Sequence, residues 1–170
     1  MSIRKLIVVC QCIEVIALAV WVGGLASIIA AVIPAVFSTI GMEAGGRMLT
    51  KTFQGYDRLT QFSAGLLLLA MMVRIWGAGV WSPSASWKEQ VGMTEFVVLM
   101  TMVAIAAALT FWLTPETARL QGIAFSAKED VKRAAYDEFF TYHRVARALY
   151  LINLGLGVTL LCMKVQKWMR

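Results

Sequence analysis

Five polar residues interrupt the apolar stretches of this sequence, where ionisable groups are costly to bury and usually pair or act in function. Glu14 and Arg74 carry opposite charges and lie about 13 Å and about 10 Å from the same end of two adjacent helices, at 1.5 Å per residue. Their similar depth predicts an ion pair or a shared hydrogen-bond network, which Gln11, one helical turn from Glu14, could join. Glu95 begins the next apolar stretch on the same side, and Asn153 lies midway along the last one.

This predicted polar cluster has two interpretations, and both stay open. In the functional one, the cluster is a pocket that handles protons or cations. In the structural one, it is a buried ion pair that fixes the register of two helices. The polar groups are few and gather toward one side, so we expect no chain of them across the apolar layer, and we assign no catalytic residue.

A second set of residues could bind haem or a soft metal ion. His143 is the only histidine, which excludes a two-histidine haem site within one chain but leaves haem with a methionine as second ligand conceivable. Cys10, Cys162 and Met163 fall on one side of the apolar segments, and thiolate and thioether ligands suit Cu(I). Cys10 and Cys12, however, point about 200° apart on a helix. We therefore predict no cofactor and keep haem or copper binding as the alternative.

The elements that must position these residues are transmembrane helices. Of the 170 residues, 59% are hydrophobic and 15% are charged, whereas a soluble domain carries about 25% charged residues. Residues 1–170 are therefore predicted to form one all-α membrane domain, a four-helix bundle of two antiparallel hairpins. A bilayer core needs about 20 apolar residues per helix, and the four predicted spans cover about residues 6–33, 59–81, 94–113 and 146–163.

The connections between these spans differ in character. We expect the first span to end at Pro34 and the glycine-containing residues 40–58 to form a bent surface segment. Pro83, Trp87 and three serines predict an interfacial turn over residues 82–92. Ser126-Ala-Lys-Glu129 fits a capping box that starts a helix of about 40 residues running through the fourth span. Long amphipathic extensions then lie on one side of the membrane.

The two halves of the sequence share an order of features. Pro34 precedes the dipeptide Tyr56-Asp57 by 22 residues, and Pro115 precedes Tyr136-Asp137 by 21. Each half contains a span, an exit at proline, a basic amphipathic segment and a returning span. This order is compatible with an internal duplication, although two matched dipeptides can also arise by chance.

The net charge of +6 indicates membrane anchoring rather than nucleic-acid binding. Basic residues flank the apolar runs, where they contact anionic head groups and set topology. Four spans place both termini on one side, and the Lys and Arg residues close to the spans favour the cytoplasm for that side. The basic residues that flank the two ends of the chain are Arg4, Lys5, Lys164, Lys167 and Arg170.

A stripe of small residues follows the first span at every fourth position. Small side chains let another helix approach closely and pack by van der Waals contact. The stripe therefore predicts a docking surface, in a homo-oligomer or in a larger membrane complex. Its members are Ala19, Gly23, Ser27 and Ala31.

Short motifs along the chain resemble those of the transmembrane protein 205-like family and, more distantly, of the copper-resistance D-type membrane proteins. The residues that carry the resemblance are Trp21, Gly23 and Gly24, Pro34 and Phe37, Pro115, and Phe140 and His143 followed by Asn153. The copper-resistance D-type proteins and the four-helix protoporphyrinogen oxidases carry a histidine in the first span, which this chain lacks. Its absence argues against metal transfer and against that oxidase activity.

The resemblance implies a four-helix fold common in bacteria, with largely undefined activity, and hence a bacterial inner membrane. We predict a non-enzymatic membrane protein that acts in a transport-related process or as an accessory subunit of a larger complex. The alternative is a haem- or copper-binding membrane protein that handles electrons or metal ions.

Overall fold

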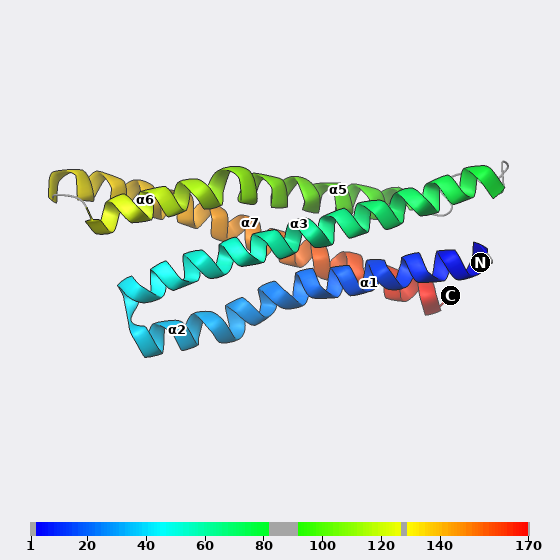
Figure 1. The fold of residues 1–170 in the computed structure, drawn as a ribbon, viewed down its shortest axis with the longest axis horizontal. Helices are drawn as coiled ribbons and strands as arrows, with labels where there is room; N and C mark the ends of the chain where they lie inside the picture. The colour runs from blue at the N-terminus through cyan, green and yellow to red at the C-terminus, as the bar shows by residue number, and fades with distance from the viewer. Residues whose placement is uncertain (1–2, 82–91, 127–128, 170) are drawn as a thin grey trace.

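A computed structural model describes residues 3–81, 92–126 and 129–169, with side chains for 5–77, 92–124, 133–167 and 169. These residues are almost entirely helical and include no strand, so the predicted all-α fold is confirmed. The helices are α1 (Ile3–Ser27), α2 (Ile33–Ile40), α3 (Met42–Trp81), α5 (Met93–Ala108), α6 (Thr114–Ser126) and α7 (Glu129–Met169) (Figure 1). Two π-helical turns, η1 (Ile28–Val32) and η2 (Leu109–Leu113), join α1 to α2 and α5 to α6.

Four continuous helical segments are long and apolar enough to cross a membrane, and they make the chain an integral membrane protein. Each has 32 to 36 residues. At 1.5 Å per residue they are about 50 Å long, whereas the apolar layer of a bilayer is about 30 Å thick, so the helices extend beyond it. The segments are Lys5–Ile40, Met42–Gly77, Met93–Ala124 and Arg133–Lys167.

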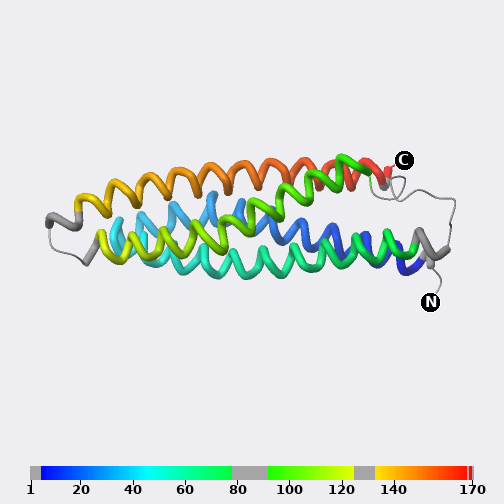
Figure 2. Tube along the Cα trace, turned by 90° about the horizontal axis from the view of Figure 1, so that it is seen from above, coloured from blue at the N-terminus to red at the C-terminus, as the bar shows by residue number. Residues whose placement is uncertain are grey.

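The helices form two antiparallel hairpins, as predicted. In the first, α1, η1 and α2 run against α3, and in the second, α5, η2 and α6 run against α7 (Figure 1). α1 and α5 each pack against both α3 and α7, so the outgoing and returning helices alternate around the bundle. Figure 2 shows that the bundle is elongated and that both termini lie at the same end.

The first span does not end at Pro34, which corrects the prediction. The helix continues through Pro34 to Ile40. A proline inside an α-helix lacks an N–H, and its ring clashes with the carbonyl group four residues earlier. For Pro34 that carbonyl belongs to Ala30, inside η1, and the wider π-helical turn moves it out of the way. Pro115 follows η2 in the same manner, and α6 continues the helix.

The connection between the first two spans is the single residue Gly41, whose φ of 78° lies in the left-handed region that favours glycine. The predicted bent segment over residues 40–58 is wrong, because α3 begins at Met42 and stays helical throughout. Gly45 lets α2 pack closely, since a Cβ atom there would lie 3.1 Å from the Phe37 side chain. This glycine serves helix packing rather than bending.

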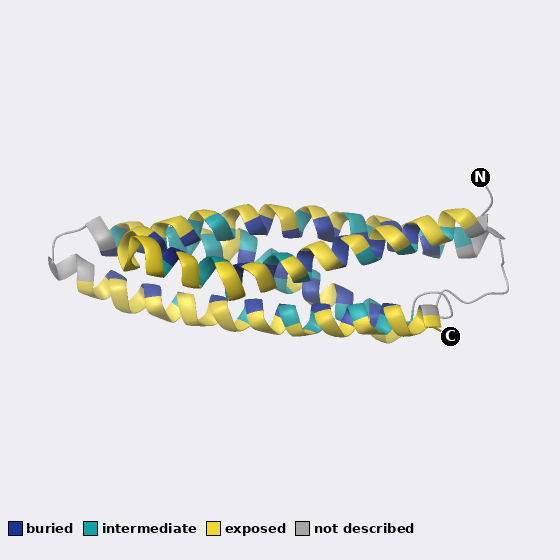
Figure 3. Ribbon diagram, turned by 90° about the horizontal axis from the view of Figure 1, so that it is seen from below, coloured by how far each residue is buried: buried dark blue, intermediate teal, exposed yellow. Residues whose placement is uncertain are grey.

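Each long helix buries side chains at alternating steps of three and four residues, the spacing of coiled-coil-like bundles. Figure 3 shows these buried positions facing the bundle interior. Together they form the seam of the bundle. The seam residues are Glu14, Leu18, Trp21, Leu25 and Ile28; Asp57, Thr60, Ala64, Leu67, Met71 and Arg74; Glu95, Leu99, Met102, Ala106 and Leu109; and Ala146, Tyr150, Asn153, Gly157, Leu160 and Lys164.

The outgoing helices of the two hairpins repeat each other at an offset of 81 residues. Glu14 and Glu95 stand 81 apart, as do Pro34 and Pro115 and the first residues of η1 and η2. The Tyr-Asp dipeptides that suggested a duplication are not equivalent, because Asp57 is buried and Asp137 is exposed. The internal similarity therefore lies in the outgoing helices.

The long final helix agrees with the prediction. α7 has 41 residues, against about 40 expected from the sequence at helical rise. The capping box over residues 126–129 falls outside the described side chains, and most of the predicted interfacial turn at 82–92 falls outside the described residues.

Candidate functional site

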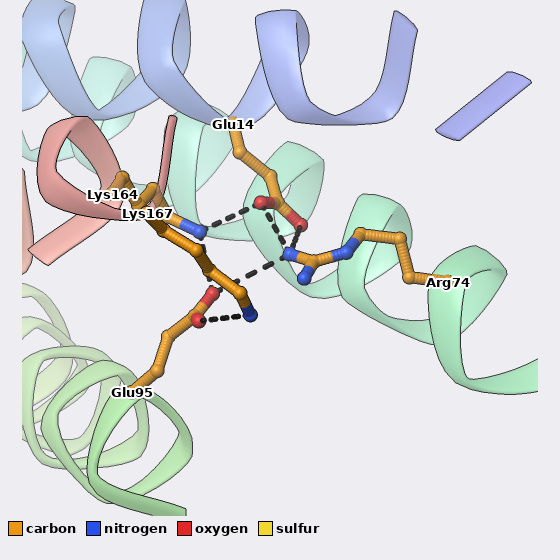
Figure 4. Close-up of polar contacts among 5 residues, drawn as sticks. All are labelled: Glu14, Arg74, Glu95, Lys164 and Lys167. Carbon is orange, nitrogen blue, oxygen red and sulfur yellow. Dashed lines mark hydrogen bonds and ion pairs between the residues drawn. The ribbon is translucent and has the colours of Figure 1, made fainter. Parts of the chain in front are cut away.

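Four charged side chains, one from each long helix, meet at one depth of the bundle (Figure 4). They are Glu14 of α1, Arg74 of α3, Glu95 of α5 and Lys164 of α7, and all four are buried. We call these four residues the charge ring. Each occupies a seam position of its helix, so the same packing that builds the core directs the four charges toward one another.

Acidic and basic members alternate around the charge ring, and each contacts both of its neighbours. Arg74 Nη1 lies 2.8 Å from Glu14 Oε2 and 3.4 Å from Glu95 Oε1. Lys164 Nζ donates hydrogen bonds to Glu14 Oε2 and to Glu95 Oε1, each at 2.6 Å. Four ion pairs thus close a ring that links all four helices.

The charge ring encloses little space. A cavity of about 10 Å³ lies among its members, and Gln11, Val15 and Lys167 complete its lining. Such a volume holds about one water molecule. Lys167 Nζ lies 3.9 Å from Glu95 Oε2, and its side chain is 45% exposed. Lys167 therefore connects the ring to the surface at the end of the bundle that carries the termini.

Burying four charges has a desolvation cost, which ion pairs offset only when every charge is well compensated. In the charge ring each member has two partners of opposite sign. Removal of one member of a buried pair costs about 3–5 kcal/mol, whereas replacing the whole set by apolar residues of similar volume is often neutral or stabilising. Stability alone therefore gives no reason for charged residues at this depth.

The structure brings together Glu14, Arg74 and Glu95, whose common depth the sequence predicts, and Gln11 lines their cavity. Asn153 lies apart from them. It is eleven residues from Lys164 in the sequence, about 16 Å along α7. Its Nδ2 atom donates to the Met102 carbonyl at 3.4 Å, and its Oδ1 atom has no hydrogen-bond partner among the described residues.

Lys164 is the ring member that the sequence analysis missed. Its place near the end of the last span fits the basic flank that contacts head groups, but it is buried, and its ammonium group completes the ring. Its spacing could have revealed this, because it continues the three-and-four pattern of Tyr150, Asn153, Gly157 and Leu160 along the inner face of α7.

The candidate ligands for haem or copper lie at separate places. His143 is exposed on α7 and stacks on Phe139 with ring centroids 5.7 Å apart. Cys10 is buried, Cys162 is exposed and Met163 is half-buried. Among the described residues, no three His, Cys, Asp or Glu side chains are grouped to hold a metal ion. Haem or copper binding stays the alternative to the prediction that no cofactor is bound.

A second buried polar cluster, which sequence reasoning did not identify as a site, lies farther along the bundle. Tyr150 donates a hydrogen bond to Asp57 Oδ1 at 2.7 Å, and the Thr114 hydroxyl lies 3.4 Å from the Tyr150 hydroxyl. Thr60 is buried one turn along α3 from Asp57. Asp57 precedes Arg74 by 17 residues, about 25 Å at helical rise. This cluster therefore lies toward the opposite end of the apolar layer.

An apolar block separates the two polar clusters. Its side chains are contributed by all four long helices and fill the seam layers beyond the charge ring. Among the described residues, no continuous chain of polar groups therefore runs between the clusters through these layers. The residues of the block are Leu18, Leu67, Leu99, Met102 and Leu160.

The motif of Trp21, Gly23 and Gly24 in the first span serves helix packing. Trp21 is buried, and its carbonyl oxygen accepts a hydrogen bond from the Tyr56 hydroxyl at 3.0 Å. Gly24 makes room for the Tyr56 ring, because a Cβ atom there would lie 3.3 Å from it. Gly23 faces outward, and no other helix of the described chain comes within 4 Å of the position of a Cβ there.

The stripe of small residues is not used inside the bundle. All four positions are exposed, and α1 packs against its neighbours through the seam face instead. Within the described part of the chain, the stripe therefore faces the surroundings of the bundle. Its residues are Ala19, Gly23, Ser27 and Ala31.

Comparison with known proteins identifies one family. A family model described as a domain of unknown function, DUF4149, matches residues 16–125, a range that includes Arg74 and Glu95 but not Glu14 or Lys164. No curated protein and no solved structure matches the chain. The match gives no support to the more specific resemblance to the transmembrane protein 205-like or copper-resistance D-type proteins. Because it covers more than half of the sequence, the chain belongs to the DUF4149 family.

Proposed function

We propose that this chain is a non-enzymatic, transport-related membrane protein in which the charge ring is a gate at the end of the bundle that carries the termini. The observation that carries the proposal is the closed ring itself. Four charges from four helices contact one another at one depth, and each has two partners. Closure of this end of the bundle then depends on one set of mutually supporting contacts.

The chemistry of the ring suits a gate better than a permanent seal. A gate needs two arrangements that differ by a modest free energy. Exposing apolar side chains at this position to water would cost free energy, so apolar residues would keep this end of the bundle shut. Charged side chains recover their hydration when the helices separate, which offsets the loss of the ion pairs. The ring therefore supports a closed state that can be opened.

The described conformation is the closed one. The ring cavity of about 10 Å³ holds no more than about one water molecule. Beyond the ring, the apolar block fills the interior. A second cavity, of about 50 Å³, lies between α1 and α3 beside Arg74 and Cys10.

Vesicles containing the purified protein test the proposal. The probe is a pH-sensitive dye trapped inside, which reports the decay of an imposed pH gradient. We expect Glu14→Gln and Glu95→Gln to collapse the gradient faster than the wild type. A ring with one carboxylate removed holds the four helices together less tightly, and the apolar block on the same helices then opens with it. The matched control is Glu43→Gln, which removes an exposed carboxylate paired with Arg47 and is expected to leave the rate unchanged. Equal rates for ring variants, control and wild type would refute the gate.

A second candidate function, as an accessory subunit, is favoured by the exposed stripe on α1. Helices associate in lipid through small residues that allow close backbone approach. Gly23 has open space around it, so a leucine there would fit the monomer but obstruct a helix docked on the stripe. If the stripe binds another membrane helix, Gly23→Leu abolishes a complex isolated from native membranes, whereas Gly65→Leu on α3, also exposed with open space, preserves it.

The orientation belongs to the same proposal. We place the termini in the cytoplasm of a bacterial cell, with the bundle in the inner membrane. Support comes from the basic residues close to the spans at the terminal end. Lys164 does not count among them, because it is buried in the ring. Reporter enzymes that work on only one side of the membrane, fused to the C-terminus, test this placement. Activity of a periplasmic reporter would reverse it.

A further inference from the structure

The second polar cluster contains a buried carboxyl group without a cation. Asp57 is 4% exposed. Its Oδ1 atom accepts the hydrogen bond from Tyr150, and its Oδ2 atom has no hydrogen-bond partner among the described residues. No Lys, Arg or His of the described chain forms an ion pair with it, in contrast to the ring members Glu14 and Glu95.

The groups that face Asp57 from the neighbouring helices are neutral. α7 contributes the Tyr150 hydroxyl, and Thr114 at the start of α6 lies beside that hydroxyl. On α3 itself, Tyr56 points to the Trp21 carbonyl, and Thr60 lies one turn away. An ionised carboxylate in such surroundings lacks the compensation that buried charges require, and a buried carboxyl in this situation takes up a proton instead.

A proton also accounts for an unpartnered oxygen. With hydrogen on Oδ2, the carboxyl group becomes a donor on that side. The Thr60 hydroxyl, also without a hydrogen-bond partner among the described residues, lies one turn away on α3. Protonation thus removes the charge that this oxygen would otherwise hold without a hydrogen bond.

We propose that Asp57 is a proton-binding site at the end of the bundle opposite the charge ring, protonated at rest and held by Tyr150. The ligand is a proton, bound to one carboxyl oxygen. This inference does not rest on the gate, because it concerns another end of the bundle and a different charge state. It places a neutral, protonatable group and a ring of paired charges on opposite sides of the apolar block.

Infrared spectroscopy of the full chain in lipid tests the proposal at neutral pH. A protonated carboxyl group absorbs separately from carboxylates, and its band shifts in heavy water. We expect this band in the wild type, its loss in Asp57→Asn and its loss from the wild type at strongly alkaline pH. The matched control is Asp137→Asn, which removes the exposed aspartate of the second Tyr-Asp dipeptide and is expected to keep the band.

A second variant keeps the test decisive if Asp57→Asn does not fold. Tyr150→Phe retains the carboxyl group but removes its hydrogen-bond donor, so the band should move without disappearing. An apolar carbodiimide, which attacks protonated carboxyl groups, should label the Asp57 peptide in the wild type. A band that neither Asp57→Asn nor Tyr150→Phe affects would overturn the proposal. Absence of the band from the folded wild type at neutral pH would also overturn it, and protection of Asp57 from the carbodiimide by sodium ions would then favour a cation site.

Discussion

The ammonium group of Lys164 lies 2.6 Å from the carboxylate of Glu14, although 150 residues separate them in the sequence. This contact joins the first and last helices of the bundle and closes the charge ring. It also explains why the ring depends on the whole chain, because the two residues belong to different hairpins. Substitutions that weaken the ion pairs of the charge ring should therefore also lower the free energy of unfolding of the whole bundle.

The losses of stability from removing two oppositely charged ring members should be less than additive. Glu14→Ala leaves Arg74 and Lys164 with one carboxylate between them, and we expect a loss of about 3–5 kcal/mol. In Glu14→Ala/Lys164→Ala, one charge of each sign is gone, so the combined loss should fall short of the sum by about 1–3 kcal/mol. Denaturant titration in detergent measures the double-mutant cycle, and additive losses would show that the two residues do not interact.

Gly157 should be intolerant of a methyl group, because α1 and α5 pack against it closely. A Cβ atom at this position would lie 2.6 Å from the Val22 side chain and 3.2 Å from that of Met102. We expect Gly157→Ala to destabilise the bundle by about 1–3 kcal/mol through overpacking. Gly155→Ala, with nothing within 4 Å, should be neutral or stabilising by up to about 1 kcal/mol. Thermal unfolding of both variants compares them, and equal midpoints would argue against this helix contact.

The hydroxyl of Tyr56 should contribute to stability through its hydrogen bond to the Trp21 carbonyl. The bond is 3.0 Å long and buried, so Tyr56→Phe removes a polar contact between α3 and this carbonyl. The expected loss is about 1 kcal/mol, because the Trp21 carbonyl keeps its backbone hydrogen bond within α1. Tyr136→Phe, at an exposed position, serves as the control and should change the free energy of unfolding little.

Gly41 should be needed for the one-residue turn between α2 and α3. Its φ of 78° is unfavourable for a residue with a Cβ atom, and Gly41→Ala should cost about 1–2 kcal/mol. Gly55→Ala, inside α3 with open space around it, should stabilise the helix instead. The free energy of unfolding of each variant checks the turn, and a stabilised Gly41→Ala would mean that the hairpin is built differently.

Hydropathy was sufficient to predict the four helices, the two hairpins and the shared side of the termini. It failed at Pro34 and Pro115, because a π-helical turn before each proline removes the clash that would end an ordinary α-helix. It failed again over residues 40–58, where Gly45 provides room for α2 instead of a bend. Local residue preferences describe isolated helices, and at these points packing between helices decided the outcome.

The candidate site was predictable in part. Glu14 and Arg74 stand out because a charge inside an apolar run is conspicuous, and their depths follow from helical rise. Lys164 did not stand out, because a lysine near the end of a span resembles an anchor for head groups until the seam spacing of α7 is considered. Asp57 and Tyr150 come from different hairpins, and only the packing of α3 against α7 brings them together.

Accessibility of Cys10 tests the central claim, that the charge ring holds the terminal end of the bundle closed, most directly. Cys10 is 5% exposed and lies one helical turn from Glu14. With Cys12 and Cys162 replaced by serine, it becomes the only thiol, and its labelling by a membrane-impermeant maleimide reports opening of this end. We expect Lys164→Met to raise the labelling rate at least about tenfold, equivalent to a loss of about 1.4 kcal/mol of closure. The same rate in Lys164→Met and in the parent protein, with both folded, would contradict the account.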